Sequence, residues 1–129
     1  MTTQEVANRL VSLCRQGQFE QACIELYSPD IISIEAEGVP DRVVKGMQAV
    51  AEKGQAFERR VEQFHSCQVS DPIVADDFFT CGMFMNIKFH DAPAAVDMNE
   101  ICVYQVKNGK IVQEAFYYTP MHQLEVTSS

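Results

Sequence analysis

The spacing of apolar residues changes about halfway along the chain, from the period of a helix to the period of a strand. Three stretches before residue 65 carry an apolar residue at every third or fourth position, which favours amphipathic helices. After residue 65, apolar and polar residues alternate, as they do in a strand whose two faces meet different surroundings. Helices followed by a run of antiparallel strands are typical of an α+β domain.

The three predicted helices lie in the first half of the chain. The first starts after Thr2, whose spacing to Glu5 fits a capping box, and it stops at Gly17. The second starts near Phe19 and ends at Ser28-Pro29, because proline disfavours a helical conformation in the residue before it. The third and longest is marked by apolar residues at helical spacing: Met47, Val50, Ala51, Phe57, Val61 and Phe64.

Four main strands are predicted, over residues 31–37, 79–89, 98–107 and 110–119. The last two are joined by Asn108-Gly109, which favours a type I′ turn because both central residues of that turn need a positive φ. A two-residue turn with regular pairing places Val103 opposite Glu114.

Alternation along this hairpin predicts two apolar faces. Glu114, Phe116 and Tyr118 share one face, which we interpret as lining a cavity, because a carboxylate among apolar residues is costly unless it is paired or solvated. The other face has no remaining segment to cover it: Cys102, Tyr104, Val106, Ile111, Ala115 and Tyr117. An exposed apolar patch favours association, so we expect a two-fold homodimer that packs through the convex face of the sheet.

Composition and charge narrow the class of protein. The 129 residues fit a single domain, with a core over about residues 3–121 and a polar tail over residues 122–129. A net charge of −8 argues against nucleic acid and anionic membranes as partners. No window approaches the ~18 apolar residues of a membrane span, and the first residues lack the basic start and apolar core of a signal peptide.

The five cysteines are scattered, odd in number and free of C-x-x-C spacing. Because they lie within apolar patterns, we expect reduced, buried thiols and a cytoplasmic protein. We expect no metal and no cofactor, since no group of His, Asp and Glu residues has metal-ligand spacing and no glycine-rich loop could cradle phosphate.

Four segments in this order resemble the SnoaL-like proteins of the nuclear transport factor 2-like superfamily: LYSPDI over residues 26–31, the strand IISIEAE, the helix after VVKGM, and the ending VYQVKNGKIVQEAFYYTP. The resemblance implies a cystatin-like fold, in which three N-terminal helices pack on a strongly curved, mostly antiparallel sheet that forms a cone with an internal pocket. That superfamily includes ketosteroid isomerases, polyketide cyclases, dehydratases, epoxide hydrolases and many proteins that are not enzymes, so the fold alone does not settle function.

The resemblance transfers few catalytic residues. The tyrosine on the first helix of the steroid isomerases falls at Leu10, and their aspartic acid on the penultimate strand is also replaced, so we do not expect that chemistry. Their general base falls near Glu35. The epoxide hydrolases and cyclases carry an aspartate on the last strand, at the position of Phe116, with Glu114 one step back on the same face.

Glu114 and His65 form the predicted acid–base pair. An apolar pocket would raise the pKa of Glu114, whereas the alternative is a carboxylate at the pocket rim, solvated or paired. His65 shares a face with Cys67 and Val69, which we interpret as inward, and there it could shuttle a proton near neutral pH. The alternative for His65 is a buried neutral side chain with a backbone partner.

Further side chains are predicted to contact a ligand. Tyr27 and Tyr118 could donate hydrogen bonds to it, with a place in the aromatic core or rim as the alternative. Glu35 shares a face with Glu37, and the two would shift one another's pKa if that face is inward. For the methionines, the alternative to lining the pocket is a place in the core. The predicted apolar lining comprises Met83, Met85 and Phe116.

From these features we expect a protein that binds a small apolar or aromatic molecule. An enzyme of this kind would use acid–base chemistry for isomerisation, cyclisation, dehydration or hydrolysis. The alternative is a non-catalytic ligand-binding or dimeric assembly module whose interior is filled by Phe and Met side chains.

Overall fold

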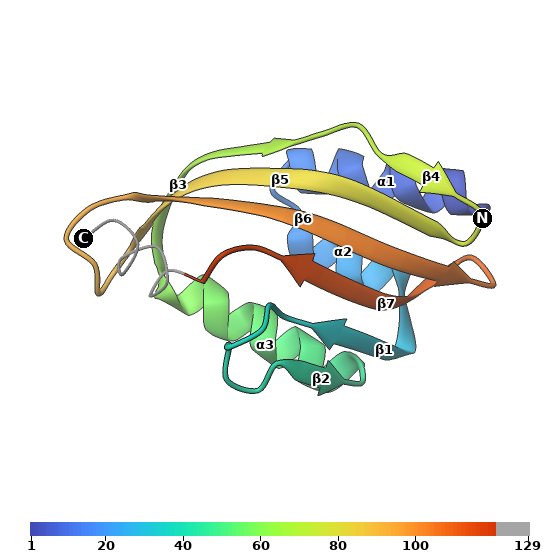
Figure 1. Ribbon diagram of the computed structural model, residues 1–129, viewed down its shortest axis with the longest axis horizontal. Coiled ribbons are helices and arrows are strands. Elements are labelled where there is room, and N and C mark those ends of the chain that lie inside the picture. The colour runs from blue at the N-terminus through green and yellow to red at the C-terminus, as the bar shows by residue number, and fades with distance from the viewer. Residues whose placement is uncertain (121–129) are drawn as a thin grey trace.

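Three helices cover one face of a curved seven-stranded sheet in the computed structural model, which describes residues 1–120 (Figure 1). The helices are α1 (Thr3–Arg15), α2 (Phe19–Leu26) and α3 (Met47–Arg60). The strands are β1 (Tyr27–Ile34), β2 (Val43–Lys45), β3 (Val61–Val69), β4 (Ile73–Ala75), β5 (Phe78–Phe89), β6 (Val96–Lys107) and β7 (Lys110–Tyr117). The predicted α+β class is confirmed, while the predicted polar tail over residues 122–129 lies outside the described residues.

The strands form one open sheet in the order β2-β1-β7-β6-β5-β3, and β4 also pairs with β5. Neighbouring strands run antiparallel except β1 and β7, which run parallel. In Figure 1, α1 and α2 pass behind the sheet and α3 lies beside β1 and β2. We call the face that the helices cover concave and the opposite face convex.

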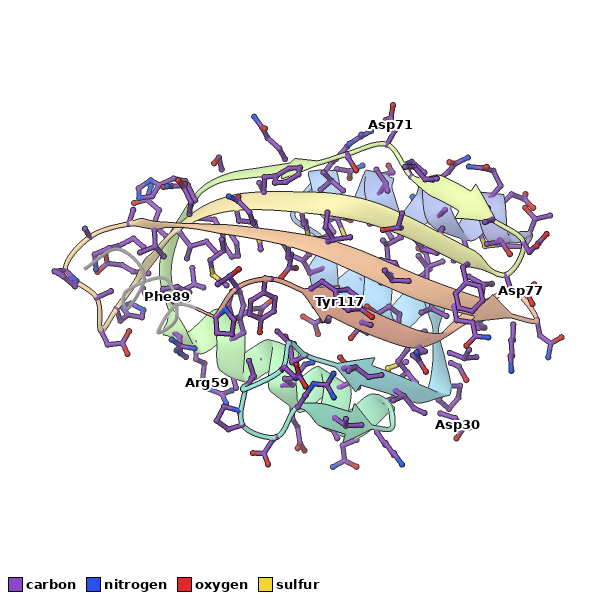
Figure 2. All side chains as sticks on the ribbon, in the orientation of Figure 1. Asp30, Arg59, Asp71, Asp77, Phe89 and Tyr117 are labelled. Carbon is purple, nitrogen blue, oxygen red and sulfur yellow. The ribbon has the colours of Figure 1, made fainter. Side chains whose placement is uncertain are left out.

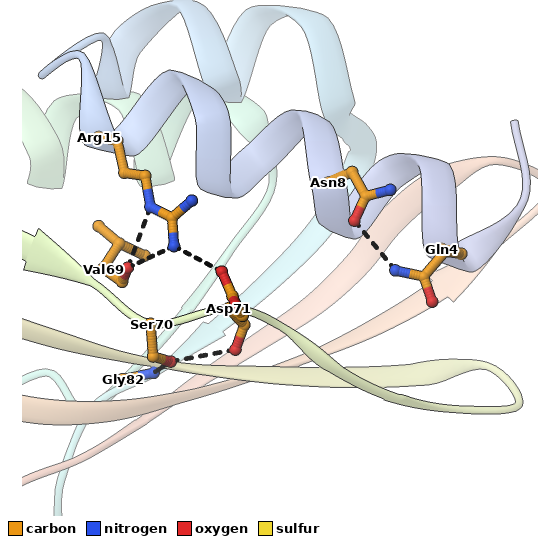
Figure 3. A network of polar contacts seen from close by, with 7 residues as sticks. All are labelled: Gln4, Asn8, Arg15, Val69, Ser70, Asp71 and Gly82. Carbon is orange, nitrogen blue, oxygen red and sulfur yellow. Dashed lines mark hydrogen bonds and ion pairs between the residues drawn. The ribbon is translucent and has the colours of Figure 1, made fainter.

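Side-chain contacts fix both ends of α1. The predicted capping box is confirmed, because the Thr2 hydroxyl accepts from the Glu5 N–H at 3.1 Å and the Glu5 carboxylate accepts from the Thr2 N–H at 2.9 Å. At the other end, the Arg15 guanidinium donates to the Val69 carbonyl at 2.8 Å and to the Asp71 carboxylate at 2.9 Å (Figure 3). These bonds fasten the end of α1 to the end of β3.

The predicted end of the third helix is wrong. Helix α3 ends at Arg60, and Val61 takes an extended conformation, with φ −81° and ψ 121°, that starts β3 directly. Phe64 makes its apolar contacts from the strand, since its ring stacks on Phe19 at 6.1 Å and lies 6.4 Å from the ring of Phe57. The apolar spacing at the end of this segment therefore marks a shared aromatic cluster and not another helical turn.

The turn between β6 and β7 forms as predicted, with positive φ at Asn108 (52°) and at Gly109 (73°). Pairing beyond the turn differs from the prediction. Gln105 pairs with Gln113, so Val112 is an extra residue in β7 and forms a β-bulge.

The bulge moves each later side chain of β7 to the opposite face of the sheet from the one that regular pairing with β6 would give. Glu114 lies opposite Tyr104 and not Val103, because a shift of one residue exchanges the two faces of a strand. The predicted exposed patch is therefore wrong, and four of its members lie in the core at 0–3% exposure: Cys102, Tyr104, Val106 and Ile111. The convex face instead exposes Ile101 (48%) and Tyr117 (60%), and Figure 2 shows Tyr117 over β7 on the side away from α1 and α2.

A glycine inside α3 offers a test of this fold. Gly54 has room for a methyl group, because nothing lies within 4 Å of a Cβ built there. Gly54→Ala should raise the free energy of unfolding by about 0.5–1 kcal/mol, since glycine is the poorer helix former. Denaturant unfolding measures the change. Gly38→Ala is the control: its surroundings are equally open, but its φ of 90° should make alanine destabilising, and stabilisation by both changes would contradict the assignment.

Candidate functional site

A buried carboxyl group lies on the concave face. Glu114 of β7 is 4% exposed and stands beside Ser33 of β1, its partner in register. Tyr27 donates its hydroxyl hydrogen to Oε1 of Glu114, and Ser33 hydrogen-bonds to the same carboxyl group. Strand β1 starts at Tyr27, earlier than the predicted residue 31, and this early start places the tyrosine next to β7.

Lys53 of α3 joins Ser33 to further polar side chains. Lys53 Nζ donates to Ser33 Oγ at 2.6 Å and to Glu35 Oε1 at 2.8 Å, and it lies 5.5 Å from the centre of the Phe116 ring. The Tyr118 hydroxyl donates to the other oxygen of Glu35 at 2.8 Å. The hydrogen bonds of Lys53 therefore connect Ser33, the register partner of the buried Glu114, to half-buried side chains beyond the ends of β1 and β7.

The surroundings of Glu114 shift its pKa in opposing directions. Burial raises the pKa, while hydrogen bonds from Tyr27 and Ser33 and the positive charge of Lys53 lower it, and burial prevails. Burial, followed by the negative charge of Glu114, raises the pKa of Tyr27 well above its ordinary value. Tyr27 therefore stays protonated and serves as a donor.

Glu100 is a second titrating carboxyl group on the same face. It is half-buried on β6, and the Cys102 thiol contacts its Oε1 at 3.6 Å. Burial raises the pKa of Glu100 to about 7, and the negative charges of Glu35 and Glu114 add to this effect. The hydrogen bond from Cys102 and the charge of Lys53 act in the opposite direction. A carboxyl group with this pKa can both accept and donate a proton at neutral pH.

Glu100 is not among the residues predicted from the sequence, because regular pairing across the hairpin places this face of β6 on the exterior. The signal that could have found it is alternation: Glu100, Cys102 and Tyr104 follow one another at every second position of β6. If that face is taken as inward, Glu100 is a carboxylate among apolar residues and becomes a candidate by the same criterion as Glu114.

Most of the predicted site residues meet in this network: Tyr27, Glu35, Glu114, Phe116 and Tyr118. His65 does not, because it is exposed on β3. The prediction that it faces inward is wrong: β3 has an irregularity between Phe64 and Ser66, which breaks the alternation with Cys67. Glu37 is exposed as well, so it is not paired with Glu35 on an inward face.

Met83 and Met85 lie buried on the concave face of β5, packed against other apolar side chains. Their contacts fit the alternative of a core position. A hollow of about 500 Å³ lies elsewhere, at the N-terminus and the β6–β7 turn, where Thr2, Lys107 and Gly109 are among its lining residues. Within residues 1–120, no group of three or more His, Cys, Asp or Glu side chains is arranged to hold a metal ion.

This fold, with a polar network on the concave face, defines a class of protein. The SnoaL-like domain model matches residues 1–118, so the chain belongs to the SnoaL-like domain family, and the resemblance read from the sequence is confirmed. No curated protein matches the chain. None of the helices in the described part of the chain is long and apolar enough to cross a membrane.

Solved structures agree with this assignment. A candidate SnoaL-like polyketide cyclase from Mesorhizobium loti is 33% identical, covers 92% of this chain and 100% of its own, and superposes with a TM-score of 0.86. TerC, co-crystallized with polyporic acid, is 11% identical over 98% of both chains, with a TM-score of 0.75. A protein from Catenulispora acidiphila with a ketosteroid isomerase-like fold, in complex with trimethylamine, is 14% identical over 89% of this chain and 85% of its own, with a TM-score of 0.71. The last two show the fold alone.

The raised pKa of Glu100 predicts how stability depends on pH. Its folded value of about 7 exceeds its ordinary value of 4.5, so its contribution to stability is fully present below pH 4.5 and is lost as pH rises through 7. Glu100→Gln should therefore stabilise the protein on the order of 2 kcal/mol at about pH 8 and change little at about pH 4. Thermal unfolding across this range measures the difference.

The control is Glu37→Gln, because that side chain is exposed. Its effect on stability should be small at every pH. A pH-independent effect of Glu100→Gln would show that Glu100 has an ordinary pKa in the folded protein.

Proposed function

We propose that this protein binds a small apolar or aromatic molecule against the concave face and transfers a proton to or from it. The observation that carries the proposal is the convergence of three carboxyl groups around Lys53: the negative charge of Glu35 raises the pKa of both Glu100 and Glu114, and the charge of Glu114 also raises the pKa of Glu100. Like charges close together in apolar surroundings lower the stability of the folded protein. Such clusters are typical of functional sites in which a side chain needs a shifted pKa. The reaction class is acid–base chemistry without a cofactor: isomerisation, cyclisation, dehydration or hydrolysis.

Each polar group has a role in such a reaction. Glu100 exchanges the proton with the ligand, since its pKa of about 7 suits both directions of transfer at neutral pH. Lys53 and Tyr118 offer a positive charge and a hydroxyl group where negative charge develops on a ligand oxygen. Glu114 is the second proton-transfer group and is linked to Lys53 through Ser33. Glu100 thus takes the role that the sequence predicts for His65.

Aromatic rings beside the carboxyl groups support an apolar or aromatic ligand. Phe116 and Tyr118 are half-buried and lie on the same stretch of chain as Glu114. Proteins of this fold have been solved with polyporic acid and with trimethylamine, which supports small-molecule binding as a capacity of the fold. The unpaired state of all five cysteines supports a reducing compartment, and we propose the cytoplasm.

A ligand screen tests where binding occurs. A panel of aromatic and terpenoid compounds would be screened by thermal shift, and hits would be mapped by the chemical shifts of backbone amides. We expect the largest changes around Glu100, Phe116 and Tyr118. Changes confined to Thr2 and Lys107 would place binding in the hollow by the β6–β7 turn and would contradict the proposal.

On a substrate identified in this way, Glu100→Gln and Glu114→Gln should each lower kcat about 100-fold or more, because each removes a titrating group while keeping its shape. Steady-state kinetics measures the loss, and Glu37→Gln is the exposed control that should retain full turnover. Full turnover by Glu100→Gln would remove Glu100 from the proton transfer.

The second candidate function is a non-catalytic assembly module. It is favoured by the packing of β5, where Phe79, Met83, Met85 and Phe89 are buried against other apolar side chains on the concave face. A panel without a single binder at millimolar concentration would favour this function over catalysis.

We also propose that the protein is a homodimer that packs through its convex face. Tyr117 and Ile101 are direct partners in register, Ile101 is also the partner of Gly82, and the Phe84 ring lies over Gly82. Exposed apolar side chains therefore adjoin one another across β5, β6 and β7. A contiguous patch of this kind is typical of an interaction surface.

Tyr117→Asp tests this interface. The change would place two carboxylates near one another in a two-fold contact, so we expect monomers where the wild type is a dimer. Light scattering after size-exclusion chromatography measures the mass. The control is Ile24→Asp, at an exposed apolar residue of α2, which should leave the dimer intact. A wild-type monomer at micromolar concentration would refute the proposal.

A further inference from the structure

Two buried cysteines face each other on neighbouring strands. Cys81 of β5 and Cys102 of β6 are direct partners in register, and both are almost fully buried on the concave face. Each thiol is the group with the largest effect on the pKa of the other. Cys102 Sγ also lies 3.6 Å from Oε1 of Glu100. The proton transfer proposed above makes no use of either thiol.

We propose that Cys81 and Cys102 form a reversible disulfide when the protein meets a hydroperoxide. Residues directly opposite each other on antiparallel strands have Cα atoms about 4.5–5.5 Å apart. A disulfide needs a Cα separation of about 4.4–6.8 Å, so the register allows the bond to close with little movement of the backbone. The other three cysteines lie on α1, α2 and β3, and none of them is a register partner of another cysteine.

The chemistry proceeds in two steps. The Cys81 thiolate attacks one peroxide oxygen, the O–O bond breaks, and sulfur is oxidised to a sulfenic acid while the released oxygen takes a proton and leaves as water or alcohol. The Cys102 sulfur then attacks the sulfenyl sulfur, the S–S bond forms, and the hydroxyl leaves as water with the thiol proton. The two thiols together supply the two electrons that reduce the peroxide.

The order of attack follows from the contact between the thiols. The interaction of the two thiols lowers the pKa of Cys81 against the effect of burial, and together with burial it raises the pKa of Cys102. Cys81 is therefore the first of the pair to form the thiolate, which is the nucleophilic species. Cys102 keeps its proton and is already beside the sulfur that it must attack.

Oxidation would also change the site, a consequence that rests on the proposed function. The Cys102 thiol stabilises the charged form of Glu100 through its hydrogen bond. A disulfide has no S–H group and cannot donate this bond, so the pKa of Glu100 should rise above its value of about 7. The redox state of the pair would thereby set the proton affinity of the residue that exchanges a proton with the ligand.

The test counts thiols in the folded wild-type protein. Reduced protein is treated with hydrogen peroxide, quenched, denatured and alkylated, and its mass is measured. We expect the number of free thiols to fall from five to three, a cross-linked peptide that joins Cys81 to Cys102, and recovery of all five thiols with dithiothreitol. Five thiols after treatment, or a link between any other two cysteines, would overturn the proposal.

Two variants sharpen the result. Cys67→Ser removes a half-buried cysteine of β3 and should still lose two thiols. Cys102→Ser should form no disulfide and should leave a sulfenic acid at Cys81 that dimedone traps. The thiol count needs neither ligand nor turnover, so it is independent of the proposed function. If the disulfide forms but the Glu100→Gln variant keeps full turnover, this proposal stands and the proposed function is removed.

Discussion

The orientation of one strand depends on a single extra residue. Val112 bulges from β7, and every side chain after it faces the opposite way from the one that regular pairing would give. Strand β7 lies between β1 and β6. The bulge therefore brings Glu114 into reach of Tyr27 on one side and places it opposite Tyr104 on the other. With regular pairing the carboxyl group would lie on the convex face, and the network around Lys53 would lose its buried end.

The polar network is held at some cost to stability. Burying a carboxyl group is unfavourable unless hydrogen bonds or an opposite charge compensate for lost hydration. Tyr27, Ser33 and Lys53 provide that compensation for Glu114, but Glu35 and Glu100 add negative charge to the same surroundings. Apolar packing of α1 against β3 and β5 supplies the stability that allows such a cluster to persist. Departures from an apolar interior of this kind are expected where a protein has a function to perform.

Local signals in the sequence predict much of this fold. The capping box at Thr2 and the turn at Asn108-Gly109 are readable because particular side chains satisfy particular backbone groups. The bulge at Val112 has no such signal, since a valine in a strand looks the same whether it is paired or extra. The bulge sets which face of β6 lies on the same side of the sheet as Glu114, so regular pairing predicts Glu114 as a site residue and leaves Glu100 out.

The parallel pairing of β1 with β7 joins the first strand of the domain to its last. The hydrogen bond between Tyr27 and Glu114 spans 87 positions of the sequence, and loop closure over such a distance is entropically costly. Contacts of this range make folding slow compared with a helical bundle of the same length. During synthesis the helices and β5 leave the ribosome well before β7, so the polar network assembles as one of the last events of folding, when the chain of the domain is nearly complete.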